Sequence, residues 1–123
     1  MKRQIRITAG SVSALAELNI TRTTEAIWQA LPLKAKASTW GDEIYFAIPV
    51  KMELENGQEA VNLGDLGYWP EGNALCIFFG PTPISKGSEI RPASAVNIFG
   101  RVTADPKVFQ KVKSGEPVTI EKV

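Results

Sequence analysis

Ala74-Leu75-Cys76-Ile77-Phe78-Phe79 is a continuous apolar run in the second half of the chain. A short apolar run of this kind is typical of a β-strand that is buried on both of its faces. The sequence therefore predicts a fully buried strand over residues 74–79.

The segments on either side of this run alternate apolar and polar residues, which indicates strands with one buried face. Ile44, Phe46, Ile48 and Val50 alternate in this way, with Tyr45 on the opposite face. Further strands are expected at residues 3–8, 12–18, 33–38, 95–99 and 118–120. Short strands separated by Gly, Pro and Asn predict an all-β domain built as a barrel or a sandwich.

Two short helices are expected to interrupt the strands. Thr23 or Thr24 can cap the first, which ends at Pro32. Asp105 can cap the second, with Pro106 at its first position, and Gly115 would end it. No internal repeat, linker or low-complexity segment divides the chain, so we expect a single domain over residues 1–123.

The composition excludes several classes of function. The chain has 14 Lys and Arg against 13 Asp and Glu, which favours neither nucleic acid nor an anionic membrane as a partner. It has no histidine, which excludes Ser-His-Asp and Cys-His catalytic units and any metal site that depends on histidine. Cys76 alone forms neither a disulfide within the chain nor a four-cysteine zinc site. We therefore expect no cofactor and no metal.

The N-terminal stretch alternates charged and apolar residues, unlike a signal peptide. No segment approaches the roughly 18 consecutive apolar residues of a membrane helix. The expected location is the cytoplasm, where the single thiol would stay reduced.

Aromatic residues gather in the segments 39–46, 64–70 and 78–83. A single aromatic residue in a small all-β domain usually belongs to the core. Taken together, and interpreted as loops because they contain Gly and Pro, these segments predict the lining of a concave apolar pocket.

Several polar residues have a structural and a functional interpretation. Ser94 and Asn97 are expected to hydrogen-bond either to the backbone, which we favour, or to a ligand. Arg91 either donates to a ligand or, as we favour, faces solvent. Asp65 is expected to close a turn through its side chain. Cys76 is expected to be unreactive, because burial raises the pKa of a thiol.

An acidic stretch surrounds Asn56-Gly57, which is a strong signal for a hairpin turn. We expect its carboxylates to form a solvated edge of the sheet. The acidic residues are Glu53, Glu55 and Glu59.

Three groups of residues resemble, in order, the short prokaryotic cyclophilin-like family. They are residues 39–46 with Pro49; Gly64-Asp65-Leu66-Gly67-Tyr68-Trp69-Pro70 with Gly72, residues 74–80 and Thr82-Pro83; and Pro92-Ala93-Ser94-Ala95-Val96-Asn97 with Gly100. Tyr-Trp-Pro and Phe-Phe-Gly-x-Thr-Pro are the most specific elements. The resemblance implies a mainly β fold with two short helices, in which about eight antiparallel strands form a closed, packed barrel.

The resemblance implies no activity by itself. True cyclophilins are prolyl isomerases that hold the substrate proline in an apolar pocket, where an arginine assists rotation of the amide bond. The Phe-His-Arg and Gln-Gly-Gly-Asp elements of those enzymes do not occur in this sequence.

Three hypotheses follow. The one we favour is a binding module with an aromatic pocket for an apolar or proline-containing peptide or a small molecule. The residues expected to form the pocket are Trp40, Glu43, Tyr45, Phe46, Tyr68, Trp69, Phe79, Thr82, Arg91, Ser94 and Asn97. The alternative is a peptidyl-prolyl cis-trans isomerase in which Arg91 or Arg101 supplies the missing arginine. A third is a packed barrel that serves as a protein-interaction surface, which full burial of the aromatic residues would support.

Overall fold

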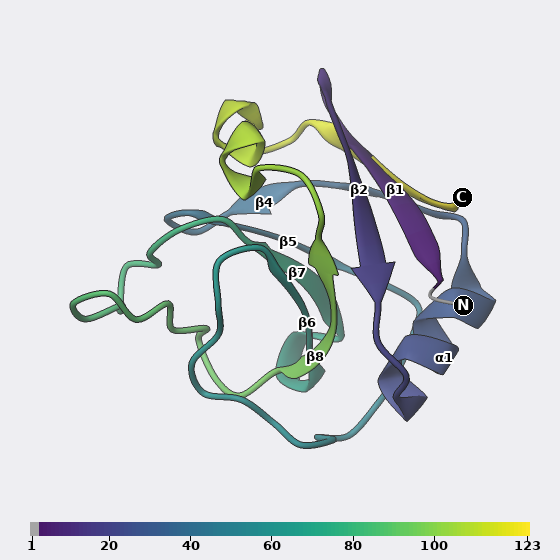
Figure 1. The fold of residues 1–123 in the computed structure, drawn as a ribbon, viewed down its shortest axis with the longest axis horizontal. Coiled ribbons are helices and arrows are strands. Elements are labelled where there is room, and N and C mark those ends of the chain that lie inside the picture. Colours follow the sequence, from purple (N-terminus) through teal and green to yellow (C-terminus); the bar gives the residue numbers. More distant parts are fainter. Residues whose placement is uncertain (1–2) are drawn as a thin grey trace.

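In the computed structural model, which describes residues 3–123, nine strands form one antiparallel sheet (Figure 1). Met1 and Lys2, at the start of the stretch compared above with a signal peptide, lie outside the described residues. The strands are β1 Gln4–Ala9, β2 Val12–Leu18, β3 Leu33–Lys36, β4 Ser38–Thr39, β5 Glu43–Ala47, β6 Asp65–Trp69, β7 Ala74–Phe78, β8 Asn97–Val102 and β9 Pro117–Lys122.

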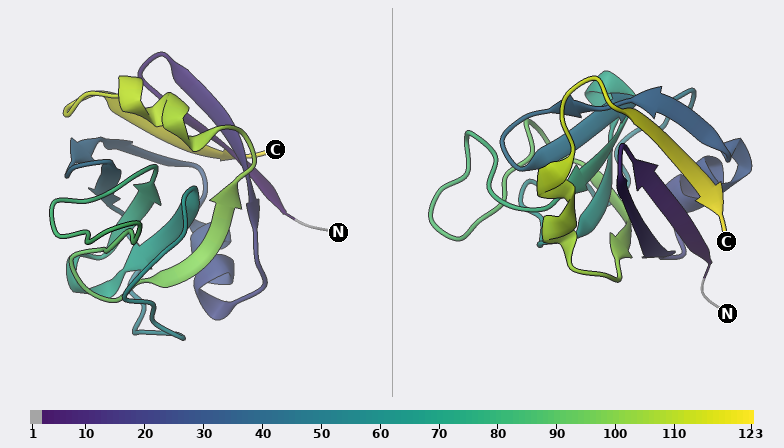
Figure 2. Two further views of the ribbon diagram at one scale, coloured as in Figure 1. Left: turned by 60° about the vertical axis from the view of Figure 1, so that its left-hand side comes forward. Right: turned by 90° about the horizontal axis from the view of Figure 1, so that it is seen from above.

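The sheet curves into a nearly closed barrel. Its strands follow the order β3-β9-β1-β2-β8-β6-β7-β5-β4, so β3 and β4 are its edges. Only Ala37 separates these two strands along the chain, and this continuity brings the two edges together (Figure 2). The predicted all-β barrel is confirmed, with nine strands in the described residues where about eight were expected.

The apolar run predicted to be buried on both faces is β7, and all five of its residues are buried. Leu75 and Ile77 belong to the core inside the barrel. Cys76 and Phe78 point to the other face, into a second apolar cluster. Because successive side chains of a strand point to opposite faces, one uninterrupted apolar run packs against both clusters.

The predicted alternation also holds around the rest of the barrel. Ile5 and Ile7 on β1 are fully buried, and the hairpin to β2 turns at Gly10, whose φ is +56°. The apolar face of β2 lies in the same core; its residues are Val12, Ala14, Ala16 and Leu18.

Short helices lie at opposite ends of the barrel (Figures 1 and 2). The helix α1 spans Arg22–Ala30, and its cap is Thr21, not Thr23 or Thr24 as predicted, because the Thr21 hydroxyl accepts the Thr24 N–H at 3.1 Å. Thr23 and Thr24 are themselves buried in the first turn.

At the other end, the 3-10 helix η2 spans Pro106–Lys111, and Asp105 caps it as predicted. It stops before Gly115, where the sequence predicted its end, and it buries Phe109 in the core. A further 3-10 turn, η1, spans Pro70–Gly72.

Two interpretations of the middle third were wrong. Residues 64–70 are mainly the strand β6 and not a loop, because the glycine inside it makes room for its neighbours: a Cβ on Gly67 would lie 3.0 Å from Val96 and 3.2 Å from the Phe78 ring. Asn56-Gly57 does not join two strands of a hairpin, although Asn56 has a φ of +52°. The chain around it forms only the isolated bridges Gln58–Val96 and Val61–Ile90.

The acidic stretch therefore has no strand edge to line. The Glu55 carboxylate instead accepts the N–H of Arg22 at 3.0 Å and both the N–H (2.9 Å) and the hydroxyl (2.7 Å) of Thr23, at the start of α1. These hydrogen bonds, the Thr23 hydroxyl first, lower the pKa of Glu55 to about 2. Within residues 3–123, no helix has the length and apolar character needed to cross a membrane.

Candidate functional site

A pocket of about 300 Å³ lies on the outer face of the barrel, where side chains of β5, β6 and β7 meet the segment that joins β7 to β8. This segment, residues 79–96, extends well beyond the barrel at the left of Figure 1. The lining residues are Trp40, Glu43, Tyr45, Trp69, Cys76, Pro92, Ala93 and Val96.

The strand geometry explains why these side chains meet. Ile44 and Phe46 on β5 point into the barrel core, so Glu43 and Tyr45 point outward. In the antiparallel register, Tyr45 lies opposite Cys76 on β7.

Three aromatic side chains form walls of the pocket. Trp40, Tyr45 and Trp69 are each half-buried, so parts of their rings stay accessible. The Trp69 indole is held in place because its Nε1–H donates to the Ser94 hydroxyl at 2.6 Å, and that hydroxyl hydrogen-bonds the Glu71 carboxylate. The walls therefore include at least one ring with a fixed orientation.

Glu43 is the acidic group of the pocket. Its side chain lines the pocket, yet the residue is only 5% exposed, and Oε1 is buried without any hydrogen-bond partner. Burial raises its pKa to about 7, an effect that a hydrogen bond from the Cys76 thiol partly offsets. Burial and the neighbouring Glu43 in turn raise the pKa of the Cys76 thiol, which is buried as predicted.

Of the eleven predicted site residues, four line this pocket: Trp40, Glu43, Tyr45 and Trp69. Phe46, Tyr68 and Phe79 lie instead in the barrel core, at 4%, 0% and 4% exposure. The Tyr68 hydroxyl donates to the Val50 carbonyl at 2.6 Å. These three side chains therefore serve the packing of the barrel.

Asn97 is fully buried and connects two segments of the chain. Its Oδ1 accepts the N–H of Glu55 at 2.8 Å, and its Nδ2 donates to the carbonyl of Glu53 at 2.9 Å and to the Thr23 hydroxyl at 3.1 Å. Backbone hydrogen bonding, the interpretation favoured for this residue, is confirmed.

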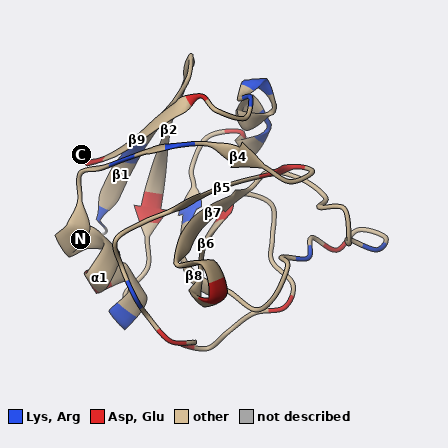
Figure 3. Cartoon of the chain, turned by 180° about the vertical axis from the view of Figure 1, so that it is seen from behind, with Lys and Arg blue, Asp and Glu red and all other residues tan. Residues whose placement is uncertain are grey.

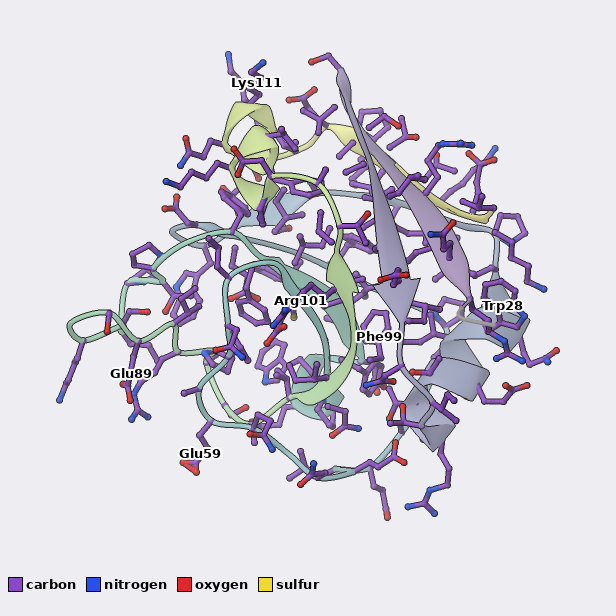
Figure 4. All side chains as sticks on the ribbon, in the orientation of Figure 1. Trp28, Glu59, Glu89, Phe99, Arg101 and Lys111 are labelled. Carbon is purple, nitrogen blue, oxygen red and sulfur yellow. The ribbon has the colours of Figure 1, made fainter. Side chains whose placement is uncertain are left out.

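The remaining predicted residues lie in the segment 79–96. Thr82 donates its hydroxyl to the Arg91 carbonyl. The Arg91 side chain pairs with Glu89 at 2.8 Å and, together with Ser94, lines a separate hollow. Figure 4 shows Glu89 on this segment, far from Trp28 on α1.

Sequence reasoning missed four lining residues, Cys76, Pro92, Ala93 and Val96. The sequence does carry a signal for Cys76, because alternate residues of a strand that is buried on both faces point away from the barrel core. That Cys76 faces Tyr45 depends on the strand register, which cannot be read from the sequence.

Asp65 closes a turn as predicted, since its carboxylate accepts the Asn62 N–H at 2.8 Å.

Charge and metal-binding groups give no further site. Acidic and basic residues are interspersed over the fold (Figure 3). In the part of the chain that the structure describes, no three His, Cys, Asp or Glu side chains lie close enough to hold a metal ion.

Comparisons with known proteins agree with this fold. The model of the cyclophilin-like family matches residues 3–121. The solution structure of a hypothetical protein from Archaeoglobus fulgidus is similar, with 43% sequence identity and a TM-score of 0.84, over 99% of this chain and 95% of the archaeal one. No curated protein matches the chain. The chain therefore belongs to the cyclophilin-like family.

Proposed function

We propose that this cyclophilin-like protein is a binding module whose outer pocket takes a small apolar ring, either as a free compound or as the proline ring of a peptide. The observation that supports this most is the group of three half-exposed aromatic side chains around one pocket, Trp40, Tyr45 and Trp69. When a ring covers exposed aromatic surface in a concave site, burial of apolar area and ring stacking both favour binding.

Intrinsic tryptophan fluorescence tests the proposal with little background. The chain has three tryptophans, and Trp28 lies on α1, outside the pocket, where Arg3 Cζ and Lys122 Nζ each lie 4.9 Å from its ring centroid. The variant Trp28→Phe therefore leaves only Trp40 and Trp69, which both line the pocket.

We expect saturable quenching or a spectral shift in this variant with ring compounds and with proline-containing dipeptides, added up to about 10 mM, since compounds of this size bind in the millimolar range. Trp69→Ala should weaken the same binding, whereas Trp28→Phe should not. No saturable change with any compound would contradict the proposal and leave the protein-interaction hypothesis.

The alternative, a prolyl isomerase, gains no support from the arginines. Arg91 pairs with Glu89, and Arg101 lies 3.6 Å from Asp65 beside other hollows of the surface. We therefore expect a protease-coupled assay on Ala-Pro and Phe-Pro peptides to return the uncatalysed rate. A faster rate that Arg91→Ala or Arg101→Ala abolishes would reverse this preference.

The cytoplasmic location expected from the sequence belongs to the same proposal. Fractionation of the source cells tests this location, and we expect to recover the protein in the cytoplasmic fraction.

A further inference from the structure

The pocket combines two kinds of group that both attract positive charge. The faces of aromatic rings carry negative electrostatic potential, and Glu43 contributes a carboxyl group. Among the pocket-lining residues of the described chain, none is basic. The pocket therefore attracts a cation in two ways, and no basic residue of its lining already pairs with the carboxyl.

We infer that the ligand of the pocket is an organic cation, a ring compound whose protonated amine donates an N–H to the Glu43 carboxylate while Trp40, Tyr45 and Trp69 surround it. This inference rests on the proposed binding function and specifies its ligand class.

The Glu43 carboxyl is buried, and one of its oxygens has no hydrogen-bond donor. A carboxyl that is 95% buried, with Oε1 unpartnered, loses the hydration it has in water and regains little from the protein. A hydrogen-bond donor bound in the pocket would supply the interaction that Oε1 lacks. A positively charged donor would stabilise the carboxylate more than a neutral one, because charge-assisted hydrogen bonds are stronger.

The aromatic walls of the pocket favour a cation over a neutral hydrogen-bond acceptor. A protonated Glu43 could instead donate to a carbonyl group of a ligand, but the ring faces would add no electrostatic attraction for that group. An ammonium group is attracted both by the Glu43 carboxylate and by the faces of the rings.

Other ionisable groups lie near Glu43, but among the pocket-lining residues of the described chain Glu43 has the one carboxyl group that a ligand can contact. They are the Cys76 thiol on β7, the Tyr45 phenol on β5, and Asp42 on the turn before β5, whose carboxylate lies against Gly80. On the covering segment, Arg91 pairs with Glu89 and lines a separate hollow.

The ionisation of Glu43 then makes binding depend on pH. With a pKa of about 7, the carboxyl is mainly protonated at pH 6 and mainly ionised at pH 8. A cation that binds the ionised form should therefore bind about tenfold more tightly at pH 8 than at pH 6. A ligand that accepts a hydrogen bond from the protonated form should show the opposite trend.

A matched pair of ligands tests the inference: 1,2,3,4-tetrahydroisoquinoline, which is protonated over this pH range, and isochroman, in which oxygen replaces the amine. Binding is followed by NMR on the labelled protein at pH 6 and pH 8, for the wild type and for Glu43→Gln. We expect the amine to bind more tightly than isochroman at pH 8. Glu43→Gln should weaken the amine at least about tenfold, as for the loss of a charge-assisted hydrogen bond, and change isochroman by less than about twofold.

A readout on the wild type does not depend on any variant. At pH 6, adding the amine should move the carboxyl carbon signal of Glu43 from its protonated toward its ionised position, and adding isochroman should not.

Each result has a distinct meaning. If both compounds bind equally at pH 8, or the Glu43 signal does not move when the amine binds, the inference is wrong while the proposed function stands. If neither compound binds and the wider set of ring compounds also fails, the proposed function fails as well.

Discussion

The change Glu43→Gln should make the protein increasingly stable relative to the wild type as the pH rises, because it removes a buried group that can ionise. The substitution keeps the size of the side chain and removes its ability to ionise. In the wild type, burial raises the pKa of Glu43 from 4.5 to about 7. The folded protein thus binds this proton more tightly than the unfolded chain does, and deprotonation favours unfolding.

The sign and size follow from this difference. The stability contributed by the protonated carboxyl is fully present below pH 4.5 and is lost as the pH rises through about 7. At 1.36 kcal/mol for each pH unit, the loss amounts to about 3 kcal/mol. The free energy of unfolding of Glu43→Gln, minus that of the wild type, should therefore increase by about 3 kcal/mol between pH 4.5 and pH 8.5.

Urea unfolding at several pH values, followed by tryptophan fluorescence, measures this difference. Glu59→Gln is the matched control, because Glu59 is exposed, and it should stay within about 0.5 kcal/mol of the wild type throughout. A difference between Glu43→Gln and the wild type that does not change with pH, or an NMR titration of Glu43 with its midpoint near 4.5, would refute the reasoning.

Three further predictions concern buried contacts that hold the barrel together, each measured by urea unfolding. Asn97→Ala leaves a backbone N–H and a carbonyl without their buried partner, so we expect a loss of about 2 to 3 kcal/mol; a loss below 1 kcal/mol would mean that water replaces the amide. Tyr68→Phe removes the hydroxyl that donates to the Val50 carbonyl, and we expect about 2 kcal/mol with an unchanged denaturant slope; no measurable loss would contradict this. Gly100→Ala places a Cβ 2.6 Å from the Glu17 carbonyl oxygen where β2 and β8 pair, and should cost at least about 2 kcal/mol; a neutral result would show that the two strands separate easily.

The strands that alternate or are wholly apolar could be predicted from the sequence. Residues 74–79 and residues 3–8 carry a pattern that depends only on which face of a strand meets the core. The 64–70 segment was misinterpreted because its glycines suggest a loop, whereas Gly67 is needed inside β6 for the close packing of Val96 and Phe78.

The sequence predicted a pocket lined by aromatic residues, but only some of the residues named for it line the pocket in the structure. Trp40, Tyr45 and Trp69 were expected together from their clustering along the chain. Phe46 and Tyr68 were expected with them, but each is next in sequence to a pocket residue and therefore points to the opposite face of its strand.

The sequence by itself determined the class of fold, because strand periodicity and the residues that end strands and helices act between near neighbours in the chain. It also excluded histidine chemistry, because the residue is absent. Only the tertiary structure decided that Glu43 is a buried acid among aromatic rings. Its burial depends on the pairing of β5 with β7 and on the segment 79–96 that lies over them, which are contacts between residues distant in the chain, as Glu43 and its partner Phe78 are. The ionisation of a carboxyl is set by this surrounding space and not by its neighbours in sequence.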